Sequence, residues 1–470
     1  MTPASGSSPG GLVAELAALA PGALVTSGAD APPDLTHDEA LGAEPVVPAA
    51  VVHPTATEQV AAVLAYADTH GVPVTARGSG TGLSGAAIPH PDGILVVFDQ
   101  MAEILEIDEA DMVAVVQPGV TLERLDAALA PRGLVYPVFP GEYSASLGGN
   151  VATNAGGMRA VKYGVTRHQI LGLEAVLAGG QVIRTGGRYV KGSSGYDLTQ
   201  LIVGSEGTLA VVTEAILRLH PRRPHQRTLL APFATLAEVT GAVPAVVNSG
   251  IDPYLCEYID LVTMAAMVDQ LGLELGVPPE LREAALAYLV VGVEGHSEER
   301  VDDDVARAAG VLADAGALDV FVLPDHSADA LIEAREKAFW LAKGSGADDI
   351  VDVVVPRSRI DTFMSGVARL AADHEAWVAG CGHAGDGNVH LSVFQPDAQR
   401  RRSLMRALFA LGAELGGAVS GEHGLGRTKS AYWLELEDPA KIELMRRIKA
   451  AFDPRGILNP GAVLTPGDTP

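Results

Sequence analysis

The sequence is poor in cysteine and in positive charge. Its 470 residues include only two cysteines, Cys256 and Cys381, which excludes a disulfide framework and a cysteine-rich metal site. Lys and Arg together number 33 against 58 Asp and Glu, so the formal net charge is −25. A surface with this charge repels phosphate, and we therefore expect no nucleic-acid partner. A small anionic substrate would require a local cationic pocket.

Long apolar runs are also lacking. The first 22 residues, MTPASGSSPGGLVAELAALAPG, contain no basic segment, and their apolar stretch is short and interrupted. Neither a signal peptide nor a transmembrane segment is indicated, so we expect a cytoplasmic protein. Hydrophobic residues make up 48% of the chain, which suffices for the cores of two or three domains.

A helix is missing where one motif requires it. Residues 80–85, GTGLSG, match G-x-G-x-x-G, and Asp99 stands where a dinucleotide-binding turn carries its ribose-binding acid. Such a turn opens a helix whose N-terminus holds the pyrophosphate. Here Pro89 and Pro91 follow almost at once and lead into a strand, so no helix fits. This disfavours a conventional Rossmann domain. The loop is either an anion-binding nest of backbone amides or a flexible turn.

Two further blocks are rich in small residues. Residues 137–157, PVFPGEYSASLGGNVATNAGG, cannot build a core, but they let the backbone approach a large flat or phosphate-bearing group. In residues 201–221 a Gly-Ser-Glu-Gly turn leads into a β-branched strand. Together with the loop at 77–85, these blocks indicate one extended cofactor.

The character of the chain changes after Pro221. Residues 1–45 resemble an N-terminal arm with a helix near 11–20, and residues 46–222 form the glycine-rich domain, which begins with a strand-helix-strand unit. Residues 223–415 alternate helices, such as 281–290, 305–316 and 404–417, with strands at 229–233, 289–295, 350–356, 376–382 and 389–394. This pattern is typical of an α+β domain. Residues 416–470 form a C-terminal segment with a helix and an irregular strap.

Two histidines flank a predicted hairpin turn. In WVAGCGHAGDGNVHLSVF, residues 377–394, a Gly-Asp-Gly-Asn loop at 385–388 would place His383 directly opposite His390. Opposed side chains on one face lie roughly 5 Å apart at Cβ, a separation that suits a divalent metal. The alternative is a pair of hairpin histidines without a ligand.

A second polar loop, SGEHGLGRTK at 420–429, carries Glu422 and His423 between glycines. Neighbouring side chains in extended backbone point in opposite directions, so one can bind a metal while the other faces a substrate. Two histidines and one carboxylate form a common three-ligand metal set. An exposed loop without a ligand is the alternative. Arg335, on a helix in LIEAREKAFW, forms either part of a site or a surface salt bridge with Glu333 or Glu336.

Seven segments in this order resemble one family. They are ARGSGTGLSG, LGGNVATNAGG, KYG, GSEGTLAVVTE, GHAGDGNVHL, GEHGLG and GILNPG. Together they resemble the FAD-linked oxidases of the vanillyl-alcohol oxidase / p-cresol methylhydroxylase fold, in particular the branch with D-2-hydroxyglutarate dehydrogenase, D-lactate dehydrogenase (cytochrome) and the glycolate oxidase FAD subunit. The resemblance covers about residues 38–463. It implies an α+β protein whose FAD-binding domain of p-cresol methylhydroxylase type has two subdomains, with an α+β cap (substrate) domain built on a ferredoxin-like antiparallel sheet.

The resemblance also implies site residues. Non-covalent FAD would be bound by Arg77, Gly78, Ser79, Gly80, Thr81, Gly82, Pro140, Gly141, Ser146, Gly148, Gly149, Thr153, Asn154, Gly157, Glu206, Gly207, Val212 and Asn459. A divalent metal, zinc or manganese, would be bound by His383, His390 and Glu422. His423 matches the catalytic base, and Arg335 matches the arginine that binds the substrate carboxylate.

The implied reaction is oxidation of a D-2-hydroxy acid to the 2-oxo acid, with hydride transfer to flavin N5. Lactate, glycolate, 2-hydroxyglutarate and longer apolar acids all remain open as substrates, because Ser392 and Ile332 depart from the hydroxyglutarate pattern and only Lys343 is a candidate second basic residue. A homodimer is expected, with a quinone, cytochrome, flavoprotein or dye as electron acceptor. Two alternatives are a flavin subunit of a glycolate-oxidase-like complex and a metal-dependent hydrolase that uses the His/His/Glu set.

Overall fold

A small, mostly parallel sheet is the first regular unit of the computed structural model, which describes residues 9–464. Its order is β1 (Leu24–Ser27), β2 (Ala50–His53), β4 (Ile94–Val97) and β3 (Val74–Arg77). Strands β2 and β3 flank α2 (Thr57–His70) in sequence, yet both pair with β4 and not with each other. No helix lies between β3 and β4, as the prolines predict. Residues 1–8 of the predicted arm and 465–470 of the predicted C-terminal segment lie outside the described residues.

The second sheet of this domain is antiparallel. Its order is β5 (Ile104–Asp108), β6 (Val113–Val116), β10 (Val211–Arg218), β8 (Ile170–Val176) and β9 (Val182–Gly186). Burial alternates strictly along β10, as expected for a strand with one face in a core. The helices of this part are α1 (Pro9–Leu19), α3 (Leu122–Leu129), α4 (Leu147–Thr153), α5 (Ala160–Tyr163) and α6 (Leu198–Ile202). Strands β7 (Leu134–Val135) and β11 (His220–Pro221) form a short pair.

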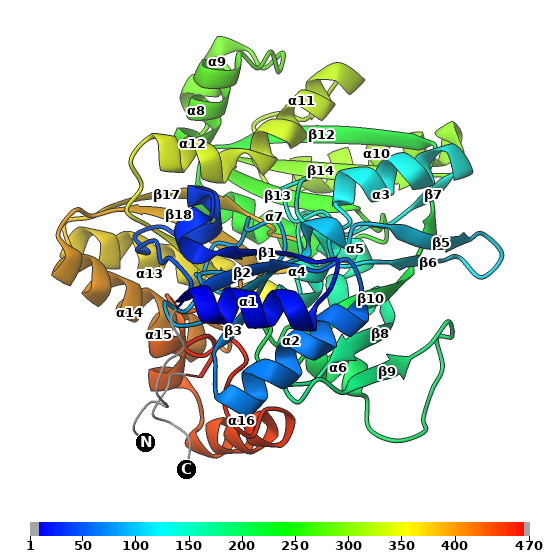
Figure 1. Ribbon diagram of the computed structural model, residues 1–470. Helices are drawn as coiled ribbons and strands as arrows, with labels where there is room; N and C mark the ends of the chain where they lie inside the picture. The colour runs from blue at the N-terminus through cyan, green and yellow to red at the C-terminus, as the bar shows by residue number, and fades with distance from the viewer. Residues whose placement is uncertain (1–8, 465–470) are drawn as a thin grey trace.

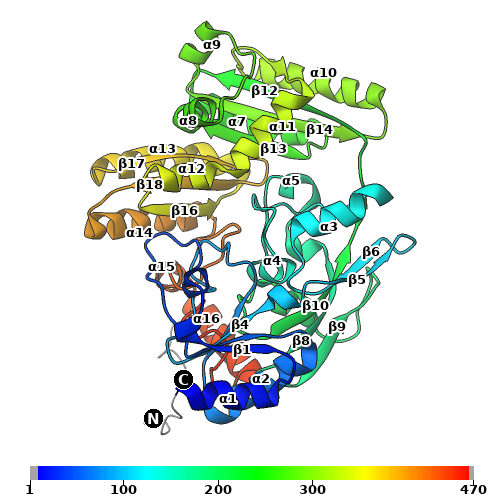
Figure 2. The ribbon, with the colours of Figure 1, turned by 45° about the horizontal axis from the view of Figure 1, so that its top comes forward.

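The cap domain is built on one antiparallel sheet of seven strands. Its order is β15 (Phe321–Val322), β12 (His225–Phe233), β14 (Ala287–Gly295), β13 (Leu255–Asp260), β17 (Trp377–Gly382), β18 (Asn388–Phe394) and β16 (Asp349–Val354). Figure 1 shows its strands above the glycine-rich domain, and Figure 2 shows the cap, in green to orange, as a layer over the blue and cyan part of the chain.

Helices cover both faces of the cap sheet. One face packs on α7 (Leu236–Asn248), α10 (Glu298–Asp314), α13 (Ile360–Asp373) and α14 (Ala398–Glu414). The opposite face packs on α8 (Leu261–Leu271), α9 (Pro279–Ala284), α11 (Asp325–Glu336) and α12 (Ala338–Gly344). The predicted helix at 281–290 is wrong in its second half, because Ala287 begins β14. Its apolar residues lie in the middle of the sheet, where burial outweighs helix propensity.

The chain then returns to the first domain. After α15 (Ser430–Leu436) and α16 (Pro439–Phe452), residues 453–464 run along the first sheet, and Leu458 forms a parallel bridge with Val74. Buried Asp453 fixes this strap by accepting hydrogen bonds from the amides of Ile457 and Leu458. Within residues 9–464, no helix has the length and apolar character needed to cross a membrane.

Candidate active site

A cavity with an empty volume of about 1320 Å³ lies between the three glycine-rich blocks. The sequence-predicted residues that line it are Arg77, Gly78, Ser79, Gly80, Thr81, Gly82, Pro140, Ser146, Gly148, Gly149, Thr153, Glu206, Gly207 and Val212. A Cβ added to Gly82 or Gly207 would meet no neighbour nearer than 3.6 Å, so both glycines border open space. The fold therefore brings segments far apart in sequence around one elongated cavity.

The first block presents free backbone donors to this cavity. Among the described residues, the amides of Gly80, Thr81 and Gly82 donate no hydrogen bond within the protein. The Arg77 guanidinium lies behind the loop and donates to the carbonyl oxygens of Asp34 and His37, at 2.7 and 2.6 Å. Burial lowers the pKa of Arg77 from its usual value, while Asp38 opposes that shift. A row of free amides backed by a buried cation fits a diphosphate group.

Four predicted cofactor residues do not line this cavity. Asn154 caps α4 in the left-handed conformation and accepts the amide of Arg167. Asn459 donates to the carbonyl oxygens of Ala86 and Glu206. Gly141 lines a neighbouring cavity. Gly157 has a positive φ, and any Cβ would collide with the Phe139 carbonyl. Asn154, Asn459 and Gly157 thus have structural roles, and direct contact of all four residues with a cofactor stays a prediction.

A second cavity, with an empty volume of about 1190 Å³, lies between the cap sheet and α8, α11 and α12. Glu422 and His423 line both cavities. Arg335, His383 and His390 line the second. The loop that the sequence singled out therefore lies where the two cavities meet.

The three predicted metal ligands converge in the structure. Their candidate ligand atoms all lie within 4.8 Å of one another. Glu422 Oε1 lies 3.1 Å from His383 Nε2 and 3.1 Å from His390 Nε2. One carboxylate oxygen shared by two imidazole nitrogens requires a proton or a cation between them. The donor set, two imidazoles and one carboxylate, fits a divalent metal.

The hairpin register differs from the predicted one. Strands β17 and β18 pair Cys381, not His383, with His390. His383 lies instead at the start of a turn over residues 383–387. Gly387 in this turn has a positive φ, and a Cβ there would collide with the Val355 carbonyl, so the position requires glycine. The two imidazoles still meet, with ring centroids 4.9 Å apart, because the turn folds His383 back over the strands.

Glu257, which the sequence analysis missed, links the substrate-binding candidate to the metal ligands. It lies on β13, and its Oε1 is 2.7 Å from His383 Nδ1. Its Oε2 forms an ion pair of 3.0 Å with Arg335 Nη2. Arg335 is buried and is not in a surface salt bridge, since Lys337 occupies Glu333. Arg335 Nε makes no hydrogen bond, and Nη2 makes only the ion pair with Glu257, so donor hydrogens of this buried guanidinium remain for a ligand.

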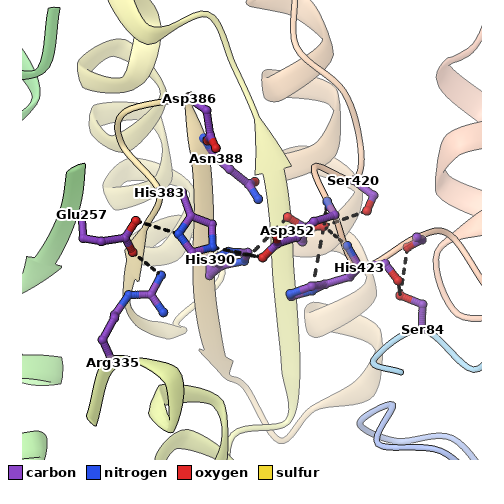
Figure 3. Close-up of polar contacts among 12 residues, drawn as sticks. Ser84, Glu257, Arg335, Asp352, His383, Asp386, Asn388, His390, Ser420 and His423 are labelled. Carbon is purple, nitrogen blue, oxygen red and sulfur yellow. Dashed lines mark hydrogen bonds and ion pairs between the residues drawn. The ribbon is translucent and has the colours of Figure 1, made fainter. Parts of the chain in front are cut away.

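Asp352, on β16, is a second missed residue and holds the polar loop. Its Oδ2 accepts the amides of Glu422 and His423 at 3.0 and 2.8 Å, and the Ser420 hydroxyl at 2.7 Å (Figure 3). Its Oδ1 lies 3.6 Å from His390 Nδ1. The His423 ring stacks on His390, with centroids 4.8 Å apart. Asp352, His390 and His423 form a second possible ligand triad, to which Asp352 would contribute Oδ1, since Oδ2 already accepts three donors and Oδ1 accepts none.

The pKa directions follow from this crowding of charges. Burial alone would lower the pKa of His383, but Glu257 and Glu422 raise it to about 10. Burial would raise the pKa of Glu422, yet His383 and His390 bring it well below its usual value. The cluster thus favours one positive charge beside the Glu422 carboxylate, whether this charge is a proton or a metal ion.

The signal that could have found the missed residues is a carboxylate flanked by apolar or aromatic residues inside a strand. Glu257 lies in LCEYID and Asp352 in IVDVVV, and both are nearly fully buried. A buried charge of this kind is rarely tolerated without a partner. Lys343, the candidate second basic residue, serves elsewhere, since it pairs with Glu39.

The family model for FAD binding domains matches residues 48–186, and the model for FAD linked oxidases, C-terminal domain, matches residues 222–463. The chain therefore belongs to the FAD-linked oxidase family, with FAD as its cofactor. An uncharacterized FAD-linked oxidoreductase of Mycobacterium tuberculosis is 56% identical, over 93% of this chain and 95% of that protein. The glycolate oxidase subunit GlcD of Bacillus subtilis is 38% identical, over 88% of each chain. A D-lactate dehydrogenase of Archaeoglobus fulgidus is 38% identical, over 88% of this chain and 91% of that protein.

Solved structures confirm the predicted fold class. p-Cresol methylhydroxylase with substrate bound superposes with a TM-score of 0.77 at 20% identity, over 96% of each chain. At this identity the likeness concerns the fold alone.

Proposed function

We propose that the protein oxidises a D-2-hydroxy acid to the corresponding 2-oxo acid, with FAD as hydride acceptor and a divalent metal beside the substrate. The observation that carries this proposal is the position of Glu422 and His423 on the wall shared by both cavities. A substrate in the second cavity would there lie against the metal ligands, the candidate base and the cavity assigned to FAD. The relatives named for glycolate and D-lactate support the same substrate class.

Each side chain has a role that its surroundings support. Arg335 binds the substrate carboxylate through Nε, which has no partner, and through the guanidinium hydrogens that Glu257 leaves free, while the Glu257 carboxylate holds the guanidinium in place. Glu257 also accepts a hydrogen bond from His383 Nδ1–H, which directs Nε2 of this imidazole toward Glu422. His383, His390 and Glu422 would hold the metal.

His423 would take the proton of the substrate hydroxyl. Its Nδ1 lies 3.9 Å from Asp352 Oδ2, so we assign Nε2 as the accepting atom. A bound divalent metal supplies positive charge that lowers the hydroxyl pKa. FAD, when bound, supplies the acceptor for the hydride that leaves C2. Asp352 and Ser84 hold the backbone on either side of His423, which fixes the base between the cavities.

Anaerobic bleaching of the flavin by D-2-hydroxy acids tests the proposal. His423→Asn should retain FAD, measured by its absorption bands, and should bleach at least 10²-fold more slowly with substrate, the range expected for loss of a general base. His390→Ala should in addition lose metal on elemental analysis. Unchanged bleaching in the first variant refutes the base, and full metal retention in the second refutes the ligand set. Absence of bleaching in the unmodified protein with every acid refutes the activity.

A flavin subunit that works within a larger complex is a second candidate, favoured by the similarity to a glycolate oxidase subunit. Turnover of the isolated chain with an artificial electron acceptor distinguishes the two. The metal-dependent hydrolase gives the FAD cavity no role and is not proposed. The homodimer, the acceptor and the cytoplasmic location stay predictions.

A further inference from the structure

We propose that the substrate is a monocarboxylic 2-hydroxy acid with a long apolar side chain, linear or aromatic, which lies in a groove along the cap sheet. This inference rests on the proposed function and deepens it. The apolar groove is the part of the second cavity that runs outward from Arg335 and His390. Its main lining residues are Val262, Phe339, Trp340, Trp377, Ala379 and Phe394.

The floor of the apolar groove is a regular surface of the sheet. Strand pairing places Cys381 opposite His390, Ala379 opposite Ser392, and Trp377 opposite Phe394. These positions alternate along β17 and β18, so their side chains share one face. Each opposed pair forms one row across the two strands. The row of Cys381 and His390 belongs to the site, the row of Ala379 and Ser392 has small side chains, and the row of Trp377 and Phe394 is aromatic.

The length of the floor exceeds what a short acid can fill. From the row of Cys381 and His390 to the row of Trp377 and Phe394 the strands advance by four residues, or roughly 13 Å at about 3.3 Å per residue. The methyl group of lactate would reach only the beginning of this distance. The small side chains of Ala379 and Ser392 leave the middle of the path open, and the rings of Trp377 and Phe394, with centroids 4.6 Å apart, form its outer end.

The roof of the apolar groove, the side formed by helices opposite the sheet, is also apolar. Val262 and Ala266 contribute from α8, and Phe339 and Leu341 from α12. The hydroxyl groups of Thr263 and Ser345 on this side are occupied by the protein itself, since Thr263 donates to the Gly380 carbonyl at 3.3 Å and Ser345 donates to the Leu341 carbonyl at 2.8 Å. The roof therefore offers dispersion contacts and little polar recognition.

The charges of the cavity exclude a second carboxylate. Arg335 is the only Lys or Arg among the residues that line it, and its position beside Glu257 assigns it to the carboxylate on C1. Glu142 and Glu336 also line the cavity, and both would repel an additional anion. Lys343 does not line the cavity and is paired with Glu39. A dicarboxylate such as 2-hydroxyglutarate would thus bury its distal charge without a partner.

The outer end of the apolar groove reaches solvent. Trp377 is 50% exposed and Trp340 is 40% exposed, although both are large apolar side chains. A side chain that extends from C2 between these two rings would cover them. The groove and the site thus form one continuous surface, with the polar end of the substrate at Arg335 and the apolar end at the tryptophans.

The test is a comparison of acids on the flavin-loaded protein. Anaerobic flavin bleaching, and turnover with an artificial electron acceptor to obtain kcat/KM, would be measured with D-lactate, D-2-hydroxyoctanoate, D-3-phenyllactate and D-2-hydroxyglutarate. We expect kcat/KM for 2-hydroxyoctanoate or 3-phenyllactate to exceed that for lactate by about 10²-fold or more, the gain expected when only two of the added carbons fit the groove at about tenfold each. 2-Oxooctanoate should also raise the melting temperature more than pyruvate does, which measures binding without turnover.

Two variants locate the effect. Ala379→Leu narrows the middle of the apolar groove, and Trp377→Ala removes its outer end. Both should lower the ratio of kcat/KM for 2-hydroxyoctanoate to that for lactate at least tenfold. Trp433→Ala is the matched control, because Trp433 lies on α15 and does not line the cavity, and its ratio should equal that of the unmodified protein. Trp377 is half exposed, so its variant tests the proposal even where Ala379→Leu does not fold.

The outcomes separate the inference from the function on which it rests. Bleaching by lactate with no gain for longer acids overturns the apolar groove and leaves the proposed function standing. Preference for 2-hydroxyglutarate likewise overturns it. Bleaching by none of the acids overturns the proposed function and this inference together. Preference for the long acids that persists in both groove variants shows that the side chain binds elsewhere, which also overturns the proposal.

Discussion

Replacement of Glu257 by glutamine tests the link between the Arg335 guanidinium and the predicted metal ligands. The carboxylate has a side chain that is only 2% exposed, and it lies 2.7 Å from His383 Nδ1 and 3.0 Å from Arg335 Nη2. Glutamine keeps the shape and removes the charge. Its amide can accept from one partner only, and its NH₂ group would face the donor of the other.

The magnitude follows from the burial of the partners. Removal of one member of a buried ion pair costs about 3–5 kcal/mol, because the remaining charge stays desolvated. Arg335 is buried and has no other acidic partner among the described residues. The free energy of unfolding should therefore fall by about 3 kcal/mol or more. Loss of the residue that orients a ligating histidine should also weaken metal binding about 10–100-fold.

Urea unfolding of the flavin-loaded protein and a metal titration measure the two effects. Glu333→Gln is the control, since Glu333 lies on the same helix as Arg335 but forms an exposed pair with Lys337. That variant should lose no more than about 1 kcal/mol and keep its metal affinity. Equal stability and equal metal affinity of Glu257→Gln and the unmodified protein would refute the role assigned to the Glu257 carboxylate.

Three further predictions concern the walls of the cavities. Gly78→Ala should weaken FAD retention, measured by absorbance after desalting, because its Cβ would collide with Ser146 Oγ. The same substitution in a Ser146→Gly background should restore part of the FAD retention. Retention by Gly78→Ala equal to that of the unmodified protein would contradict the close approach of Gly78 to Ser146. Burial raises the pKa of Glu336, which lines the second cavity, to about 7, so this side chain becomes anionic as the pH rises through 7 and should raise the KM of an anionic substrate. Glu336→Gln should flatten this rise of KM with pH. A KM that is independent of pH in the unmodified protein would contradict the effect of Glu336. Ser84→Ala removes hydrogen bonds to the carbonyl oxygens of His423 and Gly424 and should lower the free energy of unfolding by about 1 kcal/mol. Flavin bleaching by substrate should also become slower at unchanged FAD content. An unchanged bleaching rate would show that these hydrogen bonds do not position His423.

The sequence predicted the architecture well where patterns are local. The glycine-rich blocks, the absence of a helix before β4 and the strands β12, β16, β17 and β18 could be read directly. Strand β13 was not predicted. It lies in the middle of the cap sheet, and its short mixture of apolar, acidic and aromatic residues, LCEYID, has no simple period. Its place is set by pairing with β14 and β17, which are distant in sequence.

Only those residues of the candidate site that lie in sequence motifs could be predicted. His383, His390 and Glu422 come from motifs and do converge. The hairpin register was wrong by two residues, because the turn geometry that places His383 depends on the tight approach of Gly387 to the Val355 carbonyl. Glu257 could not be assigned either, since its two partners lie far from it along the chain and only the folded sheet brings them together.

Residues 420–426 of the polar loop are held at both ends by carboxylates of different domains. Asp352 of the cap accepts the amides of Glu422 and His423, and Glu206 of the first domain accepts those of Leu425 and Gly426 at 2.8 Å each. Because both ends of the loop are fixed, a ligand that binds on either side of it acts on the conformation of the whole loop. Metal bound at Glu422 and FAD bound beside Glu206 should therefore stabilise the same conformation. By thermodynamic reciprocity, the factor by which the metal raises the affinity for FAD equals the factor by which FAD raises the affinity for the metal.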